Sequence, residues 1–113
     1  MRERKEFFIG DLVKFKSDGT YGVIEHSSED AFGRGNHNEF SIMILNEKGV
    51  PINSISWIQK SQLECVDTTH REENLKKIRE YNKGHGAPIS MNPELAKMLG
   101  YGFVHTYETA MRI

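Results

Sequence analysis

The fold of this chain follows from residues 10–24, which read GDLVKFKSDGTYGVI. In residues 12–16 apolar side chains alternate with lysines, which predicts a strand with one buried and one exposed face. Residues 17–20 have turn chemistry, because Asp bonds to nearby backbone amides and Gly tolerates a positive φ. Residues 21–25 then predict the returning strand of a hairpin.

Three further strands are predicted downstream of this hairpin. Residues 40–45 are almost continuously apolar and rich in β-branched and aromatic types, which predicts a central strand covered on both faces. A turn at residues 46–49 leads into an alternating strand over 52–58, in which Asn53, Ile55 and Trp57 share one face. Residues 59–62 are predicted to form a single helical turn, and residues 63–66 a last short strand.

Two local features complete this prediction. Gly22 lies inside the returning strand, where a missing side chain indicates a bulge, a sharp bend or a close backbone approach, and a small barrel requires a bend there. The composition of residues 26–39 predicts a long polar loop. The predicted fold class is therefore mostly β: a five-stranded small barrel within residues 1–66, followed by a C-terminal α-helical extension over 67–113.

Four short stretches resemble a known group of folds. The segments GDLVKF (10–15) and GTYGVI (19–24) resemble the opening of small barrels of the Src-homology-3, Tudor and KOW type. The segments ISWI (55–58) and LECV (63–66) look like the closing strands of the same fold. The resemblance implies a barrel, which hosts peptide binders, nucleic-acid binders and assembly proteins alike. Because such barrels are frequent among short proteins of tailed bacteriophages, it also implies a viral protein.

The C-terminal third predicts two helices and an apolar end. Thr69 and Glu72 have the spacing of a capping box at the start of a helix over 70–83, whose apolar stripe is thin. An Asn-Pro pair begins a second helix over 93–99. Residues 101–113 are too apolar for a solvated tail, so we expect them to pack on the barrel or on a partner chain, and we expect a homo-oligomer.

Charge and composition restrict the partners and the compartment. The 113 residues include 15 Lys and Arg and 16 Asp and Glu, for a net charge of −1, so the chain as a whole lacks the basic excess that drives binding to phosphate backbones. Cys65 is the single cysteine, which excludes an internal disulfide framework. The N-terminal sequence lacks an apolar signal or membrane segment. We therefore expect a soluble, cytoplasmic protein, in the host cytoplasm if it is viral, with no membrane partner.

The sequence predicts no catalytic residues, no metal site and no cofactor, and so a protein that is not an enzyme. Its five histidines include no pair at i, i+2 or i, i+4 spacing. Metal coordination would require the fold to gather His26 and His37 with Glu29 or Asp30 across one loop. Cys65 alternates with Glu and Val in a strand, where a thiol packs as a small hydrophobe.

Two binding hypotheses remain. The first is a protein-interaction module, an accessory or assembly protein of phage type that binds a host or viral protein. Its contacts are expected from the loop and the C-terminal segment, namely Phe32, Arg34, His37, Tyr101, Phe103 and Tyr107. The alternative is a KOW- or Tudor-like nucleic-acid-binding barrel that holds phosphates with Arg2, Arg4, Lys5, Lys14, Lys16 and Arg34.

An exposed aromatic side chain would serve either hypothesis. Trp57, Tyr21, Phe32 and Phe40 are the candidates for such a platform. A barrel this small needs large side chains in its core, so we expect at least three of the four to be buried.

Overall fold

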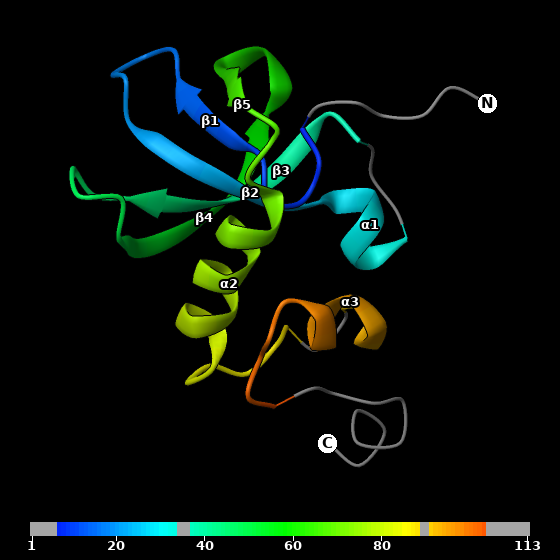
Figure 1. Ribbon diagram of the computed structural model, residues 1–113. Coiled ribbons are helices and arrows are strands. Elements are labelled where there is room, and N and C mark those ends of the chain that lie inside the picture. Colours follow the sequence, from blue (N-terminus) through cyan, green and yellow to red (C-terminus); the bar gives the residue numbers. More distant parts are fainter. Residues whose placement is uncertain (1–6, 34–36, 89–90, 104–113) are drawn as a thin grey trace.

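The computed structural model describes residues 7–33, 37–88 and 91–103. Figure 1 shows a sheet at one end of the molecule and helices beside and below it. The elements in chain order are β1 (Leu12–Phe15), β2 (Tyr21–Ser27), α1 (Ser28–Phe32), β3 (Glu39–Leu45), β4 (Pro51–Gln59), the 3-10 helix η1 (Lys60–Gln62), β5 (Leu63–Asp67), α2 (Arg71–Asn82) and α3 (Pro93–Met98). In this described part of the chain, no helix is long and apolar enough to cross a membrane.

The five strands form one antiparallel sheet in the order β4-β3-β2-β1-β5. The prediction of a mostly β chain with five strands is confirmed. Among the residues that the structure describes, β4 and β5 are the two edges of the sheet and do not pair with each other, so the closed barrel stays a prediction. The prediction that residues 40–45 form a strand covered on both faces is confirmed, since β3 pairs on both sides and is buried along most of its length, but the middle strand is β2.

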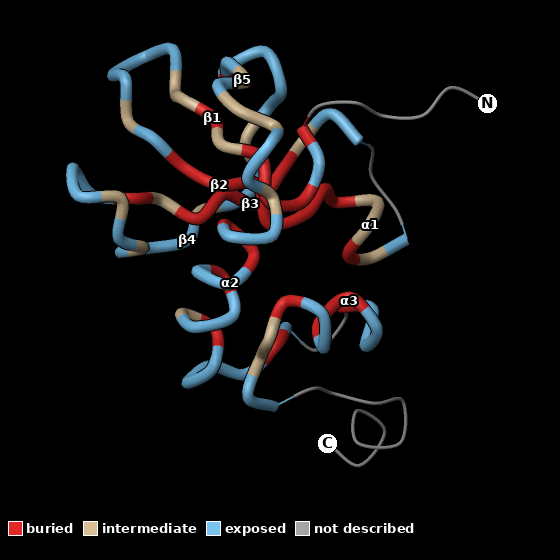
Figure 2. Tube along the Cα trace, in the orientation of Figure 1, coloured by how far each residue is buried: buried red, intermediate tan, exposed pale blue. Residues whose placement is uncertain are grey.

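Apolar side chains cover both faces of the sheet, and the buried residues run along β2 and β3 (Figure 2). On one face the predicted alternation of β1 is confirmed, because Val13 and Phe15 pack into the same cluster. This inner cluster is built around Phe7, Val13, Ile24, Phe40, Ile42 and Leu63. On the other face Val23 and Met43 meet the helices, so residues of the predicted extension share a core with the sheet.

Helix α2 is fastened to the turn that precedes β1. Arg71 Nε donates to Asp11 Oδ1 at 2.5 Å, and Asn74 Nδ2 donates to the Gly10 carbonyl at 2.8 Å. Gly10 has φ +95°, and a Cβ atom there would lie 2.6 Å from the Arg71 carbonyl oxygen, so only glycine fits. Leu75 and Ile78 form the buried stripe of α2 against the sheet.

The predicted capping box at the start of α2 was wrong. The N-cap residue is His70, and its side chain makes no capping hydrogen bond. Thr69 instead donates its hydroxyl to Asp67 Oδ1 at 2.6 Å. The carboxylate of Asp67 therefore organises this turn, because it also accepts the Thr69 backbone amide at 3.0 Å.

The long loop predicted over residues 26–39 was also wrong in part. Strand β2 continues to Ser27, and α1 follows it directly. Ser27 caps this helix, since its hydroxyl accepts the Asp30 amide at 3.0 Å, and Gly33 ends it in the left-handed conformation with φ +68°. A short helix therefore replaces the first part of the predicted loop.

Strand β4 departs from the predicted alternation as well. Opposite β3 its register shifts between Phe40 and Ile42, so one more residue of β4 is accommodated there. Ile55 packs in the inner cluster, whereas Trp57 contacts residues on the opposite face. The prediction that Ile55 and Trp57 share a face was wrong, because the bulge reverses the direction of the later side chain.

Candidate functional site

An aromatic and hydroxyl-bearing surface lies where β4 passes α1. We call it the Trp57 face and define it by His26, Phe32, Ser54, Ser56 and Trp57. The Trp57 side chain is 39% exposed. Its ring centroid lies 5.6 Å from that of Phe32, nearly perpendicular to it, and 5.5 Å from that of buried His26. These two contacts orient an exposed indole from beneath and from the side.

Hydroxyl groups connect this surface to a buried carboxyl group. Ser56 Oγ donates to Ser41 Oγ at 3.1 Å, and Ser41 Oγ donates to Glu25 Oε1 at 2.9 Å. Ser54 Oγ donates to the same carboxylate oxygen. Glu25 is 1% exposed, and its Oε2 atom has no hydrogen-bond partner in the described part of the chain. The network fixes the serines of β4 relative to β2 and β3.

Burial controls the protonation of the two titratable groups behind the face. Loss of hydration raises the pKa of Glu25, and the hydrogen bonds from Ser54 and Ser41 oppose this only in part. Burial also lowers the pKa of His26. The His26 Nδ1 atom lies 3.2 Å from the Ser27 carbonyl oxygen, which can only accept, so Nδ1 carries the proton. Both shifts favour uncharged side chains beneath the exposed indole.

Of the predicted protein-binding residues, Phe32 lies in the Trp57 face and is half-buried there. His37 lies near its border, with Nδ1 3.1 Å from Ser27 Oγ and 3.7 Å from Asp30 Oδ1. Arg34 and Tyr107 are outside the described residues.

The two remaining residues of that prediction lie in the segment after α3. Tyr101 is half-buried, and its pKa is raised to about 12 by burial first and then by the charge of Glu25 and by Tyr81. Phe103 is 51% exposed and forms a parallel bridge with Gly86. Tyr101 packs against the same core cluster as Phe32, so the loop and the C-terminal segment cover one side of the sheet.

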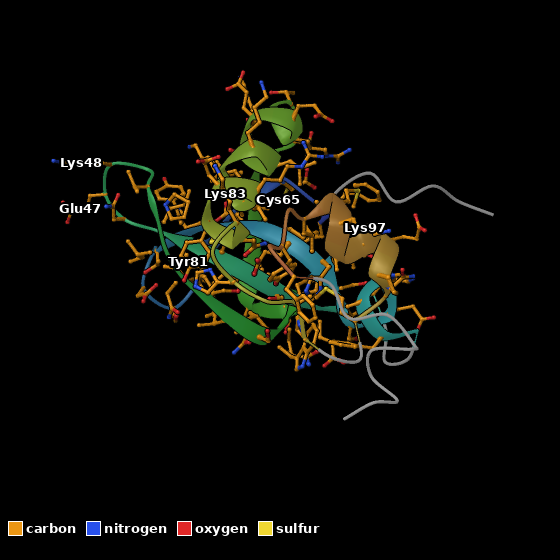
Figure 3. All side chains as sticks on the ribbon, turned by 90° about the horizontal axis from the view of Figure 1, so that it is seen from below. Glu47, Lys48, Cys65, Tyr81, Lys83 and Lys97 are labelled. Carbon is orange, nitrogen blue, oxygen red and sulfur yellow. The ribbon has the colours of Figure 1, made fainter. Side chains whose placement is uncertain are left out.

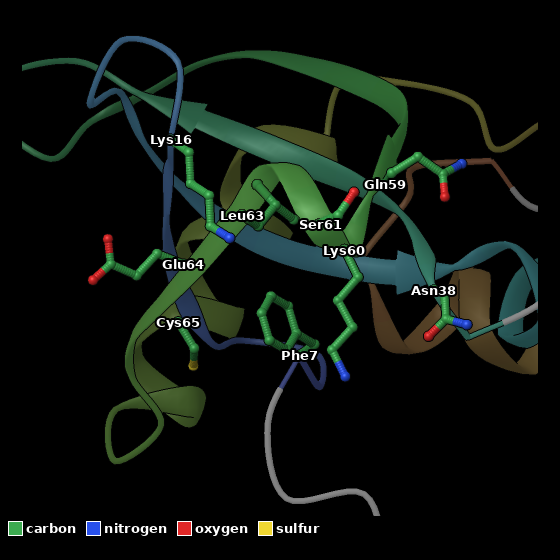
Figure 4. A pocket seen from close by; sticks show the side chains of 9 residues that line it. All are labelled: Phe7, Lys16, Asn38, Gln59, Lys60, Ser61, Leu63, Glu64 and Cys65. Atoms are coloured by element: carbon green, nitrogen blue, oxygen red, sulfur yellow. The ribbon is translucent and has the colours of Figure 1, made fainter.

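The predicted nucleic-acid-binding lysines lie in different surroundings. The Lys14 ammonium stands 6.0 Å from the ring centroid of Tyr21. Lys16 follows the end of β1 and lines a separate groove of about 600 Å³ together with Lys60 (Figure 4). The other four residues of that prediction, Arg2, Arg4, Lys5 and Arg34, are outside the described residues.

Metal-ligating and nucleophilic groups are not gathered in the described ranges 7–33, 37–88 and 91–103. No group of three His, Cys, Asp or Glu side chains there could hold a metal ion. The Cys65 side chain is half-buried in β5 and packs against the inner cluster. The Trp57 face instead combines two serine hydroxyls, which donate to Glu25 and Ser41, with a large amphipathic ring.

Sequence reasoning did not identify the Trp57 face as a unit. Burial was expected for at least three of four aromatic residues, yet Trp57 and Tyr21 are exposed and only Phe40 is fully buried. The roles of Glu25 and its serine partners were missed, although a glutamate within a run of strand residues was a visible signal. Their convergence depends on the register of three strands, which a local pattern does not contain.

Comparison with known proteins gives no relative: no protein-family model, curated protein or solved structure matches the chain.

Proposed function

We propose that this protein is a non-catalytic interaction module that binds a protein partner through the Trp57 face. The observation that carries the proposal is an indole that is 39% exposed and at the same time held by two neighbouring rings. Tryptophan is enriched among the residues that contribute most binding energy at protein interfaces. A ring that is already oriented loses little conformational freedom on binding.

The surroundings of the indole also favour a protein partner. The exposed side chains of the Trp57 face, those of Ser54, Ser56 and Trp57, carry no charge. The centres of protein interfaces are depleted in charged residues and enriched in aromatic rings. Burial moves Glu25 and His26 toward their neutral forms, so the layer beneath adds little charge.

The finer identity of the module rests on the sequence resemblance. We propose a small barrel of the Src-homology-3 type that serves as an accessory or assembly protein of a phage and binds a host or viral protein. The pairing of the last strand, β5, with the first, β1, supports this proposal, and closure of the barrel would require β4 to approach β5.

The proposal is tested by capturing partners of the tagged protein from a bacterial lysate, with and without nuclease, and quantifying them by mass spectrometry. Trp57→Ala should reduce the recovery of a nuclease-resistant partner by at least about tenfold. Ser56→Arg, which keeps the ring contacts but adds a bulky charge to the face, should do the same.

Tyr21→Ala provides the matched control, since Tyr21 is 45% exposed and lies outside the Trp57 face. The Tyr21→Ala variant should recover as much of the partner as the unmodified protein does. Equal recovery by all of these variants would contradict the assignment of the face. Circular dichroism of each variant separates a lost contact from a lost fold.

Nucleic-acid binding is the second candidate function, and the observation in its favour is the meeting of Lys16 and Lys60 in one groove. It predicts capture that disappears with nuclease and weakens steeply with added salt, because phosphate contacts release counterions. Binding of a protein partner at the Trp57 face predicts neither of these two effects.

A further inference from the structure

A groove on the side of the molecule formed by β5 and η1 brings together two lysines that are far apart in the sequence. We call it the Phe7 groove, and its volume is about 600 Å³. Lys16 and Lys60 line it together with Phe7, Asn38, Gln59 and Ser61 (Figure 4). Grooves of this size accommodate ligands as large as a mononucleotide.

The backbone on either side of the groove is fixed by hydrogen bonds. The amide of Lys16 donates to the Gln62 carbonyl at 3.0 Å, and the amide of Lys60 donates to the Asn38 carbonyl at 2.7 Å. The Lys60 ammonium is held 5.3 Å from the ring centroid of Phe7, which is itself only 5% exposed. The backbones of both lysines are therefore fixed, and the Lys60 ammonium is also held against a ring.

The polar groups of the groove suit an anion. The ammonium groups of Lys16 and Lys60 and the hydroxyl of Ser61 are donors, and among the described residues Glu64 is the one carboxylate that lines the groove. In Figure 4 the Glu64 side chain points away from the Phe7 ring. Phosphate oxygens accept several charge-assisted hydrogen bonds at once, which two lysines and a hydroxyl can supply.

We propose that the Phe7 groove binds phosphate groups through Lys16 and Lys60. The proposal does not depend on the Trp57 face, and it narrows nucleic-acid binding to one defined site. The phosphate can come from a free phosphorylated small molecule or from the backbone of a single-stranded nucleic acid. The two sources share the same recognition chemistry at the lysines.

The test is a titration of the isotope-labelled, full-length protein followed by two-dimensional NMR. Inorganic pyrophosphate is one probe, and an oligothymidylate of about ten nucleotides is the other. The amide signals of Lys16, Lys60 and Ser61 should shift and saturate with pyrophosphate. Lys16→Gln and Lys60→Gln should each weaken this binding by about five- to tenfold.

Lys48→Gln and Lys97→Gln are the matched controls, because these lysines belong to the β3–β4 turn and to α3 (Figure 3) and neither lines the groove. Their affinity for pyrophosphate should stay within about twofold of the unmodified protein. Signal shifts that fail to saturate, or equal losses in all four variants, would overturn the proposal by showing only general attraction between charges.

The two probes also distinguish the sources of the phosphate. If the oligonucleotide displaces pyrophosphate and its affinity falls steeply with salt, the site serves nucleic acid and the second candidate function is supported. If pyrophosphate saturates the site and the oligonucleotide does not compete, the Phe7 groove binds a small phosphorylated ligand. The second candidate function, nucleic-acid binding, is then contradicted. Either result supports the site itself.

Discussion

At the scale of single residues, the carboxyl group of Glu25 has an unusual position. It is 1% exposed, and in the described part of the chain its hydrogen-bond partners are the hydroxyls of Ser41 and Ser54. An ionised carboxylate loses more hydration energy on burial than neutral hydroxyl donors restore. Burial is accordingly the largest influence on the pKa of Glu25 and raises it.

This environment predicts that the protein loses stability as the pH rises. A carboxyl group with a higher pKa in the folded state than in the unfolded state holds its proton longer when folded. The free energy of unfolding should therefore fall as the pH increases above the ordinary value of 4.5 and through the raised pKa of Glu25. Each unit of the shift corresponds to about 1.4 kcal/mol at higher pH. Urea denaturation over a pH series measures this slope.

Glu25→Gln should remove that contribution and should be at least as stable as the unmodified protein at neutral pH. Glu47→Gln is the control, since Glu47 is exposed in the turn between β3 and β4 and should leave the slope unchanged. A slope that persists in Glu25→Gln would show that other groups cause it.

Gly22 is a second position where one atom decides the packing. Of the three alternatives that the sequence left open there, the structure shows a close approach, because a Cβ atom on Gly22 would lie 2.5 Å from Ile42 Cγ2 and 3.1 Å from the Met43 carbonyl oxygen. We predict that Gly22→Ala destabilises the protein by about 1–3 kcal/mol through overpacking. Thermal unfolding measures the change.

Gly84→Ala supplies the comparison for this prediction. A Cβ atom at Gly84 would meet no heavy atom within 4 Å, so the substitution adds a methyl group without a clash. Its free energy of unfolding should change by less than about 0.5 kcal/mol. Equal effects at Gly22 and Gly84 would contradict the packing argument.

At the scale of elements, the sequence predicted the strands and helices that have a strong apolar periodicity. It failed where a capping hydrogen bond or a β-bulge determines the local structure. The strands over residues 12–16 and 40–45 were predictable because their apolar residues follow the strand period or form a continuous run. Helix α1 was missed, since five residues are too short for a helical period to appear. Its signals were the capping Ser27 and the terminal Gly33, within a segment whose polar composition suggested a loop.

The contact between α2 and the turn before β1 gives an element-level prediction. Asp11 is fully buried and bonds to Arg71, whose side chain is 34% exposed. It also accepts the Phe8 amide at 2.8 Å. Asp11→Asn should lower the free energy of unfolding by about 2–3 kcal/mol, because it leaves Arg71 without its charged partner and a buried amide in its place.

Chemical denaturation of Asp11→Asn measures this loss. Asp18→Asn is the matched control, because Asp18 is exposed and accepts the Thr20 amide at 2.9 Å, a bond that asparagine can also accept. It should change stability by less than about 0.5 kcal/mol. If Asp11→Asn were equally mild, the ion pair with Arg71 would contribute little to holding α2.

At the scale of the whole molecule, the sequence predicted the mostly β class, the number of strands and the two C-terminal helices. It did not predict how side chains from different strands would meet. Glu25 joins Ser41 and Ser54 only because three strands pair in one register. Trp57 reaches Phe32 only because β4 bulges opposite β3. Such side-chain contacts depend on the register of strands that are far apart in the sequence, and a local sequence pattern does not determine that register.

The described surface offers two regions of different chemistry. The Trp57 face is uncharged on its exposed side chains and presents an aromatic ring, whereas the Phe7 groove presents two ammonium groups. They are built from opposite faces of the sheet, since Phe32 packs with the helix-side cluster and Phe7 with the inner cluster. Binding at one region therefore leaves the other open, and each can be tested separately.

Hydrogen exchange on the complex with the captured partner tests the central claim most directly. Amide exchange would be followed by mass spectrometry for the free protein and for the complex. We predict that new protection is concentrated in α1 and in residues 54–57 of β4, because the partner covers the Trp57 face. Protection that is confined to residues 59–65 and to the segment around Lys16, with residues 54–57 unchanged, would contradict the account and place the partner in the Phe7 groove.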